Sequence, residues 1–195
     1  LAQNLQSYEN AVLFFSEAVR IDKNFAAAYR ERGRAFQQLK KFRDAFEDYK
    51  VALSIDPYSF NTLVSRGLLF CQQSEFERAI DDFTRAIQLK PQSADAHYNR
   101  ALAFQKLDKL DLSILDYTQA LKLNPSHFQA YNNRGLVYRE TQLFRKALRD
   151  FDRSIALKPD LADAFWNKAL THLMIGDFEN AWKYYEHRWQ SPNFT

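Results

Sequence analysis

The sequence has little of what would break helices or cross-link the chain. Its 195 residues include four glycines, five prolines and one cysteine. So few glycines and prolines argue against a β-rich or a disordered chain, and a single cysteine, Cys71, excludes a disulfide within the chain. No apolar run approaches the ~18 residues that are needed to span a membrane. We therefore expect a folded protein with no membrane partner, and a reducing, cytoplasmic compartment is favoured.

Charge of one sign is also scarce. The formal net charge is +3, and basic and acidic residues alternate along the chain. A polyanion-binding tail would instead show a block of like charges. We therefore expect no nucleic-acid partner. An RNA-binding array of helical hairpins is the weaker alternative, and salt-sensitive binding to RNA would support it.

Motifs for catalysis and metal binding are missing as well. The sequence has no HExxH or CxxC spacing and no glycine-rich phosphate loop. Cys71 has no histidine three or four residues away that could activate its thiol. We therefore expect a protein that is not an enzyme and that holds no cofactor and no metal.

What the chain does have is a repeat of 34 residues, which is marked by Pro57, Pro91, Pro125 and Pro159. When each unit is numbered from 1 to 34, starting at Ala26, position 8 is always Gly or Ala, position 20 is Ala or Ser, and position 24 is aromatic. Apolar residues at positions 4, 8 and 11 form one amphipathic stripe, and those at 17, 20, 24 and 27 form another. Each unit therefore predicts two closely packed helices, the second of which ends before the proline.

In length, spacing and residue type this unit resembles the tetratricopeptide repeat, in the form found in bacterial arrays. The resemblance implies an all-α, right-handed superhelical solenoid of antiparallel helix hairpins with about eleven helices. We expect one solenoid domain over residues 1–195, with a partial repeat at 1–25 and repeats at 26–59, 60–93, 94–127, 128–161 and 162–195. The first residue is Leu1 rather than methionine and falls inside a repeat, so we expect a fragment of a longer chain.

Position 7 departs from the family pattern, in which leucine is usual. It is occupied by Arg32, Arg66, Arg100, Arg134 and Lys168, while position 23 is occupied by Asp48, Asp82, Asp116, Asp150 and Tyr184. The arginine and the aspartate are lost in the same repeat. Because charges near a packed interface need partners, this pattern predicts an Arg–Asp pair between the two helices of each repeat. A row of arginines that bind a ligand is the alternative.

The resemblance also implies a groove lined by the first helix of each hairpin. Position 6 on that helix is asparagine in three successive repeats. An asparagine amide both donates and accepts, so it can pair with the backbone of an extended peptide whatever its side chains. The expected contacts are Asn99, Asn133, Asn167, Tyr98, Asn132, Trp166, Arg30 and Arg139. Tyr98 and Trp166 would be rigid aromatic anchors, although packing between repeats is an equal alternative for both.

These features predict a protein–protein interaction scaffold that binds an extended peptide or partner segment in its concave groove. Some family members hold a carboxylate-ended chaperone tail with three lysines or arginines and two asparagines. Ser65, Asp95 and Asn99 stand at three of those positions, so the clamp is absent.

The last helix is unusually aromatic and carries Trp182, Tyr185, Glu186, Arg188 and Trp189. It resembles the W-x-x-Y-E-x-R-W segment that closes repeat arrays in some bacterial proteins, where a glycosyltransferase-like domain can follow. We therefore expect an interface at Trp182, Tyr185 and Trp189. The alternative function is a substrate-recognition arm of a larger, glycosyltransferase-like enzyme. A helix that folds back on its own array, or self-association through this end, are the remaining alternatives.

Overall fold

The structure is a computed structural model that describes residues 2–186, in which eleven helices follow one another. The chain contains two compact units, residues 1–92 and 93–195. The first unit contains α1 (Ala2–Ile21), α2 (Ala26–Gln38), α3 (Phe42–Ile55), α4 (Phe60–Gln72) and α5 (Phe76–Leu89). The second contains α6 (Ala94–Lys106), α7 (Leu110–Leu123), α8 (Phe128–Glu140), α9 (Phe144–Leu157), α10 (Ala162–Met174) and α11 (Phe178–Tyr185). That both units form one solenoid domain stays a prediction.

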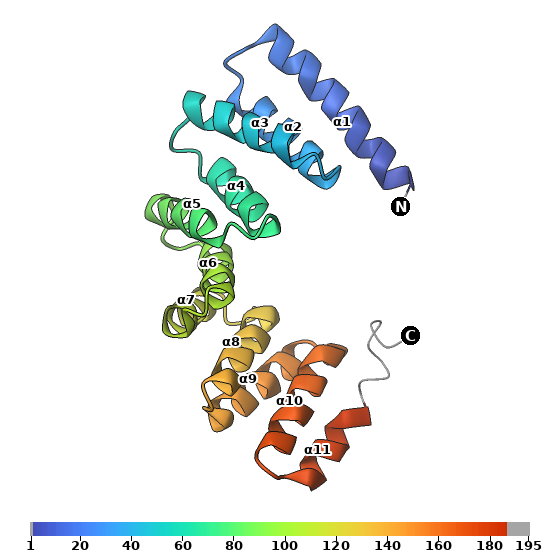
Figure 1. Ribbon diagram of the computed structural model, residues 1–195, viewed down its shortest axis with the longest axis vertical. Coiled ribbons are helices and arrows are strands. Elements are labelled where there is room, and N and C mark those ends of the chain that lie inside the picture. The colour runs from blue at the N-terminus through green and yellow to red at the C-terminus, as the bar shows by residue number, and fades with distance from the viewer. Residues whose placement is uncertain (1, 187–195) are drawn as a thin grey trace. The chain divides into compact units, whose positions relative to one another are not determined.

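Consecutive helices pack as hairpins, as the repeat predicts (Figure 1). In the first unit α1 packs on α2, α2 on α3 and α4 on α5, and in the second α6 packs on α7, α8 on α9 and α10 on α11. The first helices begin at Ala26, Phe60, Ala94, Phe128 and Ala162, the residues at which the repeat numbering starts. The prediction of an all-α protein with about eleven helices arranged in sequential hairpins is confirmed for the described residues. None of these helices is both long and apolar enough to cross a membrane.

The repeated proline lies just beyond the second helix of a hairpin. α3 ends at Ile55, two residues before Pro57, and α5 ends at Leu89, two residues before Pro91. Proline has no backbone N–H and disfavours a helical residue before it, so the helix stops there. The predicted helix ends are therefore confirmed.

The turn inside each hairpin contains one residue in the left-handed backbone conformation. These residues are Lys40, Ser74, Asp108, Gln142 and Gly176, with φ angles of 58°, 61°, 56°, 58° and 77°. In the first hairpin the N–H of Lys41 donates to the carbonyl of Phe36 at 2.9 Å, and the N–H of Lys40 donates to Gln37 at 3.1 Å. This pair of bonds closes the helix end in the way that usually selects glycine.

Glycine in place of these side chains should stabilise the protein. We expect Lys40→Gly and Gln142→Gly each to raise the free energy of unfolding by about 0.5–1 kcal/mol. A left-handed backbone costs an ordinary residue about 1–2 kcal/mol, and the greater freedom of glycine in the unfolded chain offsets part of that gain. Urea denaturation followed by circular dichroism measures the change. Lys41→Gly is the control, because Lys41 has an ordinary φ of −84°; a similar gain there would contradict the explanation.

The core of each hairpin forms where a ring of the second helix covers a small residue of the first. The four rings Tyr49, Phe83, Tyr117 and Phe151 are completely buried. A Cβ atom placed on Gly67 would lie 2.6 Å from Cε1 of Phe83, well inside normal contact distance. Positions 8 and 24 therefore touch directly, which confirms the close approach that the small residues predict.

The predicted Arg–Asp pairs form in all four repeats that contain them. Nε and Nη2 of Arg32 donate to the two carboxylate oxygens of Asp48 at 2.8 and 2.7 Å. The same two-point contact joins Arg66 to Asp82, Arg100 to Asp116 and Arg134 to Asp150. The four aspartate side chains are between 3% and 8% exposed. Carboxylates at that depth need a cation, so the pairs hold the two helices of each hairpin together.

The fifth repeat satisfies its position-7 cation in another way. Nζ of Lys168 donates to Asp152 of α9 at 2.6 Å and lies 3.8 Å from the centre of the Tyr184 ring. Burial opposes the charge on Lys168, but its contacts with Asp152 and Tyr184 raise the pKa of this amine above its ordinary value. The tyrosine at position 23 thus replaces the aspartate as the partner on the second helix.

Candidate functional site

The predicted contact residues are divided between the two units. Arg30 lies on α2 in the first unit, where its Nε and Nη2 donate to the neighbouring carboxylate of Glu31 at 3.0 and 2.8 Å. The second unit contains Tyr98, Asn99, Asn132, Asn133, Arg139, Trp166, Asn167, Trp182 and Tyr185. Trp189 lies outside the described residues. The candidate site is therefore the face that α6, α8 and α10, the first helices of the second unit, present together.

Side-chain amides connect these three helices through a chain of hydrogen bonds, which we call the amide relay. Nδ2 of Asn133 donates to the hydroxyl of Tyr98 at 3.0 Å, and Nδ2 of Asn132 donates to Oδ1 of Asn133 at 3.4 Å. Nδ2 of Asn167 then donates to Oδ1 of Asn132 at 3.1 Å. Two members of the predicted asparagine row, Asn133 and Asn167, are thus joined through their neighbour Asn132.

The amide relay leaves hydrogen-bonding capacity unused. An amide has two N–H donors and an oxygen with two lone pairs, whereas each relay member uses at most one of each in these bonds. The third member of the row, Asn99, is half-buried on α6 and makes no side-chain hydrogen bond within residues 2–186. Its amide is therefore the one best able to take an external partner.

A cavity of about 660 Å³ lies beside the amide relay. Its wall combines the apolar side chains of Leu136, Leu170, Leu173 and Met174 with the polar side chains of Gln105, Arg139, Glu140 and Gln142. Nη1 of Arg139 donates to the backbone carbonyl of Asn167 at 3.5 Å, which links the cavity to the amide relay. Burial lowers the pKa of Arg139. Asn132, Leu136 and Arg139 follow one another at helical spacing and so share one face of α8.

Both predicted aromatic anchors already pack against neighbouring rings. The ring of Tyr98 lies 4.5 Å from His127 and 5.8 Å from Tyr117, measured between centroids. The ring of Trp166 lies 5.2 Å from Tyr185 of α11. Burial raises the pKa of the Tyr98 hydroxyl, although its hydrogen bond with Asn133 acts in the opposite direction. Packing therefore occupies part of each ring, and both remain half-buried beside the candidate face.

Sequence reasoning missed the apolar part of this cavity. Leu136 and Leu170 occupy position 9 of their repeats, and Leu173 occupies position 12, positions that the family pattern assigns to the groove. The contacts expected from the sequence were all polar or aromatic, so these leucines were not among them. Their recurrence at position 9 was the available signal.

Models of one protein family match three segments of the chain. Residues 67–108 match a TPR repeat model, and residues 94–127 and 135–187 match tetratricopeptide-repeat models. These segments include the position-8 and position-24 contacts of Gly67 with Phe83 and of Gly135 with Phe151. The chain is a tetratricopeptide-repeat protein.

Several solved structures resemble this tetratricopeptide-repeat protein. MamA is 26% identical, with a TM-score of 0.77 over 81% of this chain and 92% of MamA. YrrB, described as a TPR protein with an unusual peptide-binding site, is 21% identical, with a TM-score of 0.76 over 92% of this chain and 93% of YrrB. PilF of Pseudomonas aeruginosa is 20% identical, with a TM-score of 0.76 over 87% and 77% of the two chains. No curated protein matches the sequence significantly.

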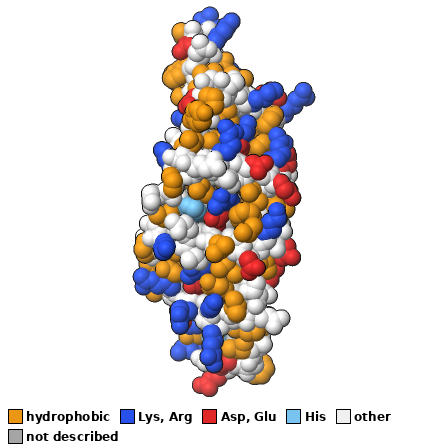
Figure 2. Space-filling view, turned by 90° about the vertical axis from the view of Figure 1, so that its left-hand side faces the viewer, with side chains coloured by type: hydrophobic (Ala, Val, Ile, Leu, Met, Phe, Trp, Pro, Cys, Tyr) orange, Lys and Arg blue, Asp and Glu red, His pale blue; other side chains and the backbone are white. Residues whose placement is uncertain are grey.

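Tetratricopeptide repeats are protein–protein interaction modules, so this protein is a scaffold of that class. Its surface suits contacts of mixed character. On the face that Figure 2 shows, Lys and Arg side chains are intermixed with Asp, Glu and hydrophobic side chains. The alternation of charge along the sequence thus persists on this surface.

The aromatic end of the second unit is exposed in part. Trp182 of α11 packs edge-on against Tyr185 at 5.2 Å but is still 58% exposed, and Phe178 is 60% exposed. These rings are apolar surface at the end of the last described hairpin. An interface there stays a prediction.

Metal-ligand side chains do not cluster in the part of the chain that the structure describes. No group of three or more His, Cys, Asp or Glu side chains in residues 2–186 is arranged to hold a metal ion. Burial raises the pKa of the Cys71 thiol to about 11, so the thiol stays protonated near neutral pH. A protonated thiol is a poor nucleophile, which leaves Cys71 a packing residue of α4.

Proposed function

We propose that this tetratricopeptide-repeat protein binds an extended segment of a partner protein along the first-helix face of its second unit, and that it acts by binding alone. The observation that carries the proposal is the pairing of the amide relay with the adjoining apolar cavity. Polar groups that can recognise a peptide backbone thus border apolar groups that can receive side chains. The description of YrrB as a protein with a peptide-binding site supports this use of the fold.

The spacing of the amides suits an extended peptide. Neighbouring helices pack about 8–10 Å apart, and an extended chain advances about 3.3 Å per residue. One amide per repeat therefore meets the peptide at about every third residue. Asn99 on α6 and the unused sites of Asn133 on α8, one repeat further along the chain, therefore pair with backbone groups about three residues apart, independent of the peptide's side chains. Asn132, next to Asn133, adds a further donor and acceptor at the second of these points.

The cavity adds affinity and orientation. Leu136, Leu170 and Leu173 are half-buried and present an apolar floor, and burial of apolar area is worth about 25 cal/mol per Å². Arg139 uses Nη1 for the carbonyl of Asn167. Its remaining N–H groups donate to a carbonyl or carboxylate of the peptide and so set the direction in which it lies.

The test begins with peptides selected from a random displayed library against the whole chain. Binding of the best fluorescein-labelled peptide is then measured by fluorescence anisotropy. We expect Asn99→Ala to weaken binding about three- to tenfold, since one hydrogen bond contributes about 0.5–1.5 kcal/mol. Leu170→Glu places a charge on the apolar floor and should weaken binding by more than about tenfold.

The control variant is Leu115→Glu on α7, a second helix, where the leucine is 65% exposed. It adds the same charge away from the candidate face and should leave the affinity within about twofold. Circular dichroism spectra and melting temperatures establish that all variants are folded. Peptides that bind equally well to Leu170→Glu and to the unchanged protein would contradict the proposal, as would an equal loss in Leu115→Glu.

A further inference from the structure

The position-7 cations reach not only the second helix of their own hairpin but also the second helix before it. Nη1 of Arg32 donates to the hydroxyl of Ser16 at 3.3 Å, and Nη1 of Arg134 donates to the hydroxyl of Thr118 at 2.9 Å. In both cases the acceptor precedes the arginine by 16 residues, just as the paired aspartate follows it by 16. Each of these guanidinium groups therefore donates to two helices, the second helix of its own hairpin and the helix that precedes the hairpin.

Arg66 is an exception to this arrangement. The residue 16 positions earlier is Lys50, which can only donate, and its Nζ instead contacts the carboxylate of Glu47 at 3.4 Å. Nε and Nη2 of Arg66 both donate to Asp82 at 2.7 Å. Its Nη1 makes no hydrogen bond to any residue between 2 and 186. The Arg66 side chain is only 17% exposed, so a strong donor is left unused in a largely enclosed place.

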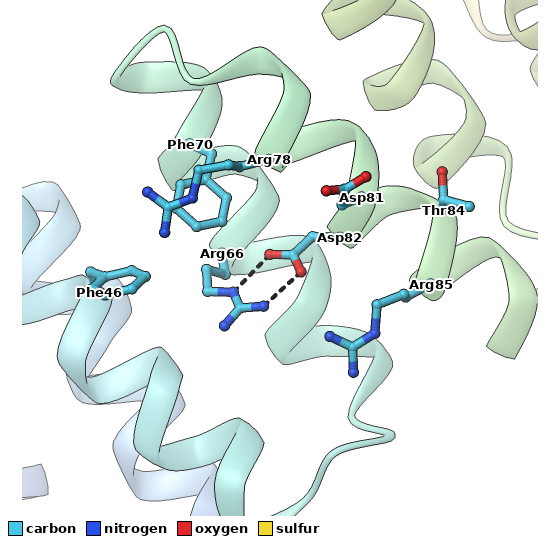
Figure 3. Close-up of a pocket in the computed structure, with 8 residues that line it drawn as sticks. All are labelled: Phe46, Arg66, Phe70, Arg78, Asp81, Asp82, Thr84 and Arg85. Carbon is cyan, nitrogen blue, oxygen red and sulfur yellow. Dashed lines mark hydrogen bonds and ion pairs between the residues drawn. The ribbon is translucent and has the colours of Figure 1, made fainter.

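This donor faces a cavity of about 540 Å³ bounded by α3, α4 and α5 (Figure 3). Arg66, Arg78 and Arg85 line it together with Phe46. The guanidinium of Arg78 lies 4.0 Å from the ring centre of Phe70 and 5.2 Å from that of Phe46. Nη2 of Arg85 donates to the backbone carbonyl of Pro57 at 3.2 Å. We call this space the α3–α5 cavity.

The charged side chains of the cavity wall limit the charge that a bound ligand can carry. Its lining side chains are three arginines and the two aspartates Asp81 and Asp82, and Arg78 is ion-paired with Glu75, which is not part of the lining. Asp82 is committed to Arg66, whereas Asp81 is exposed and makes no ion pair in the described chain. The donor left for a ligand is therefore Nη1 of Arg66. A single carboxylate suits this donor, while a phosphate dianion would bring a second negative charge close to Asp81.

We propose that the α3–α5 cavity binds a carboxylate side chain of a partner polypeptide. Nη1 of Arg66 donates to the carboxylate, and the exposed Arg85 adds a second positive charge at the cavity wall. The half-buried ring of Phe46 contacts an apolar side chain next to the acidic residue. The site belongs to the first unit and is formed with two second helices, so it is separate from the first-helix groove of the second unit.

The experiment uses the whole chain labelled with ¹⁵N and follows the arginine Nε–Hε signals by nuclear magnetic resonance. The probe is the dipeptide acetyl-Phe-Glu-amide, compared with acetyl-Phe-Gln-amide and with inorganic phosphate at constant ionic strength. We expect the Arg66 signal to shift saturably with the glutamate probe. The glutamine probe and phosphate should each bind at least about tenfold more weakly.

Lys50 gives a matched pair of variants, since its side chain is 62% exposed and its replacement leaves the core intact. Lys50→Thr supplies the hydroxyl that Thr118 supplies to Arg134, so it should occupy Nη1 of Arg66 and weaken probe binding about tenfold. Lys50→Met removes the same charge without adding an acceptor and should change the affinity by less than about twofold. Arg85→Gln should also weaken binding, whereas Arg153→Gln, at the same repeat position on α9, should not.

Four results would overturn the proposal. One is the absence of a saturable shift of the Arg66 signal with the glutamate probe, and another is an equal affinity for the glutamine probe. Tighter binding of phosphate than of the glutamate probe would assign the cavity to phosphate and not to a carboxylate. Equal behaviour of Lys50→Thr and Lys50→Met would remove Nη1 of Arg66 from the site.

Discussion

Replacing Arg134 with methionine should lower the free energy of unfolding by about 3–5 kcal/mol, the usual cost of leaving a buried charge without its partner. Arg134 supplies hydrogen bonds of 2.7 and 2.9 Å to Asp150, whose side chain is 6% exposed. Methionine retains much of the packing volume of arginine but donates nothing. Urea denaturation followed by circular dichroism measures the loss.

The double variant Arg134→Met with Asp150→Leu is the control. Apolar side chains of similar volume often replace a buried ion pair at no net cost, so the double variant should recover most of the stability lost by the single one. If Arg134→Met fails to fold, the folded double variant still isolates the unpaired carboxylate as the cause. A single variant that unfolds at the same urea concentration as the unchanged protein would contradict a structural role for the pair.

The equivalent change in the third full repeat should cost less. Asp116 accepts from Arg100 at 2.6 and 2.8 Å, but it also shares a hydrogen bond of 3.2 Å with Nδ1 of His97. Arg100→Met therefore leaves Asp116 with one polar partner, whereas Asp150 loses both bonds that Arg134 supplied. We expect the free energy of unfolding to fall by about 1 kcal/mol less than in Arg134→Met, consistent with one net hydrogen bond.

The 34-residue period predicted the hairpins well because each unit repeats the same contacts. Gly67 meets Phe83, and Arg66 pairs with Asp82, at positions that recur along the chain. Such a signal is local in the sequence and is reinforced by every copy. The left-handed turn residues were not foreseen, since Lys40 and Asp108 share no chemical property that would mark a positive φ. The hydrogen bonds that end the first helix impose this conformation.

The candidate site was predicted only in outline. The period places Asn99, Asn133 and Asn167 at one position of successive first helices, but it does not say which amide donates to which. That the relay passes through Asn132 depends on side-chain directions that a repeat pattern does not contain. The cavity leucines were available from the same pattern and were overlooked because apolar residues on a repeat helix resemble core.

One side-chain hydrogen bond could also have been predicted from the sequence, because it joins two residue types that recur together. Tyr117 at position 24 donates its hydroxyl to Gln105 at position 12, at 3.0 Å, and Tyr49 donates to Gln37 at 2.8 Å. Where position 24 is Phe83, which has no hydroxyl, position 12 is not glutamine. In the first four repeats the identities of the two positions vary together because a buried tyrosine hydroxyl needs an acceptor. The fifth repeat departs from this pattern, with the half-buried Tyr185 at position 24 and Leu173 at position 12. Such linked positions extend what a single repeat sequence can predict from helices to individual side-chain contacts.

A large residue at position 67 and a small one at position 83 should together cost less stability than the two changes cost separately. Phe83→Ala removes a fully buried ring and should cost about 3–5 kcal/mol of stability. Gly67→Leu should also be costly, because even its Cβ would lie 2.6 Å from the Phe83 ring. In the double variant the new leucine occupies the space that the ring has left. We therefore expect its loss of stability to be smaller than the sum of the two single losses by about 2 kcal/mol.

A second pair of changes provides the reference for this comparison. Val137→Ala also creates space in a fully buried core position, but Val137 belongs to α8 in the other unit. Combined with Gly67→Leu it should give losses that add, within about 0.5 kcal/mol. Urea denaturation of the six proteins, including the unchanged chain, gives both coupling free energies. If the Gly67 and Phe83 changes added as the reference pair does, direct contact between positions 8 and 24 would not be what holds the hairpin helices so close, and the small residues would need another explanation.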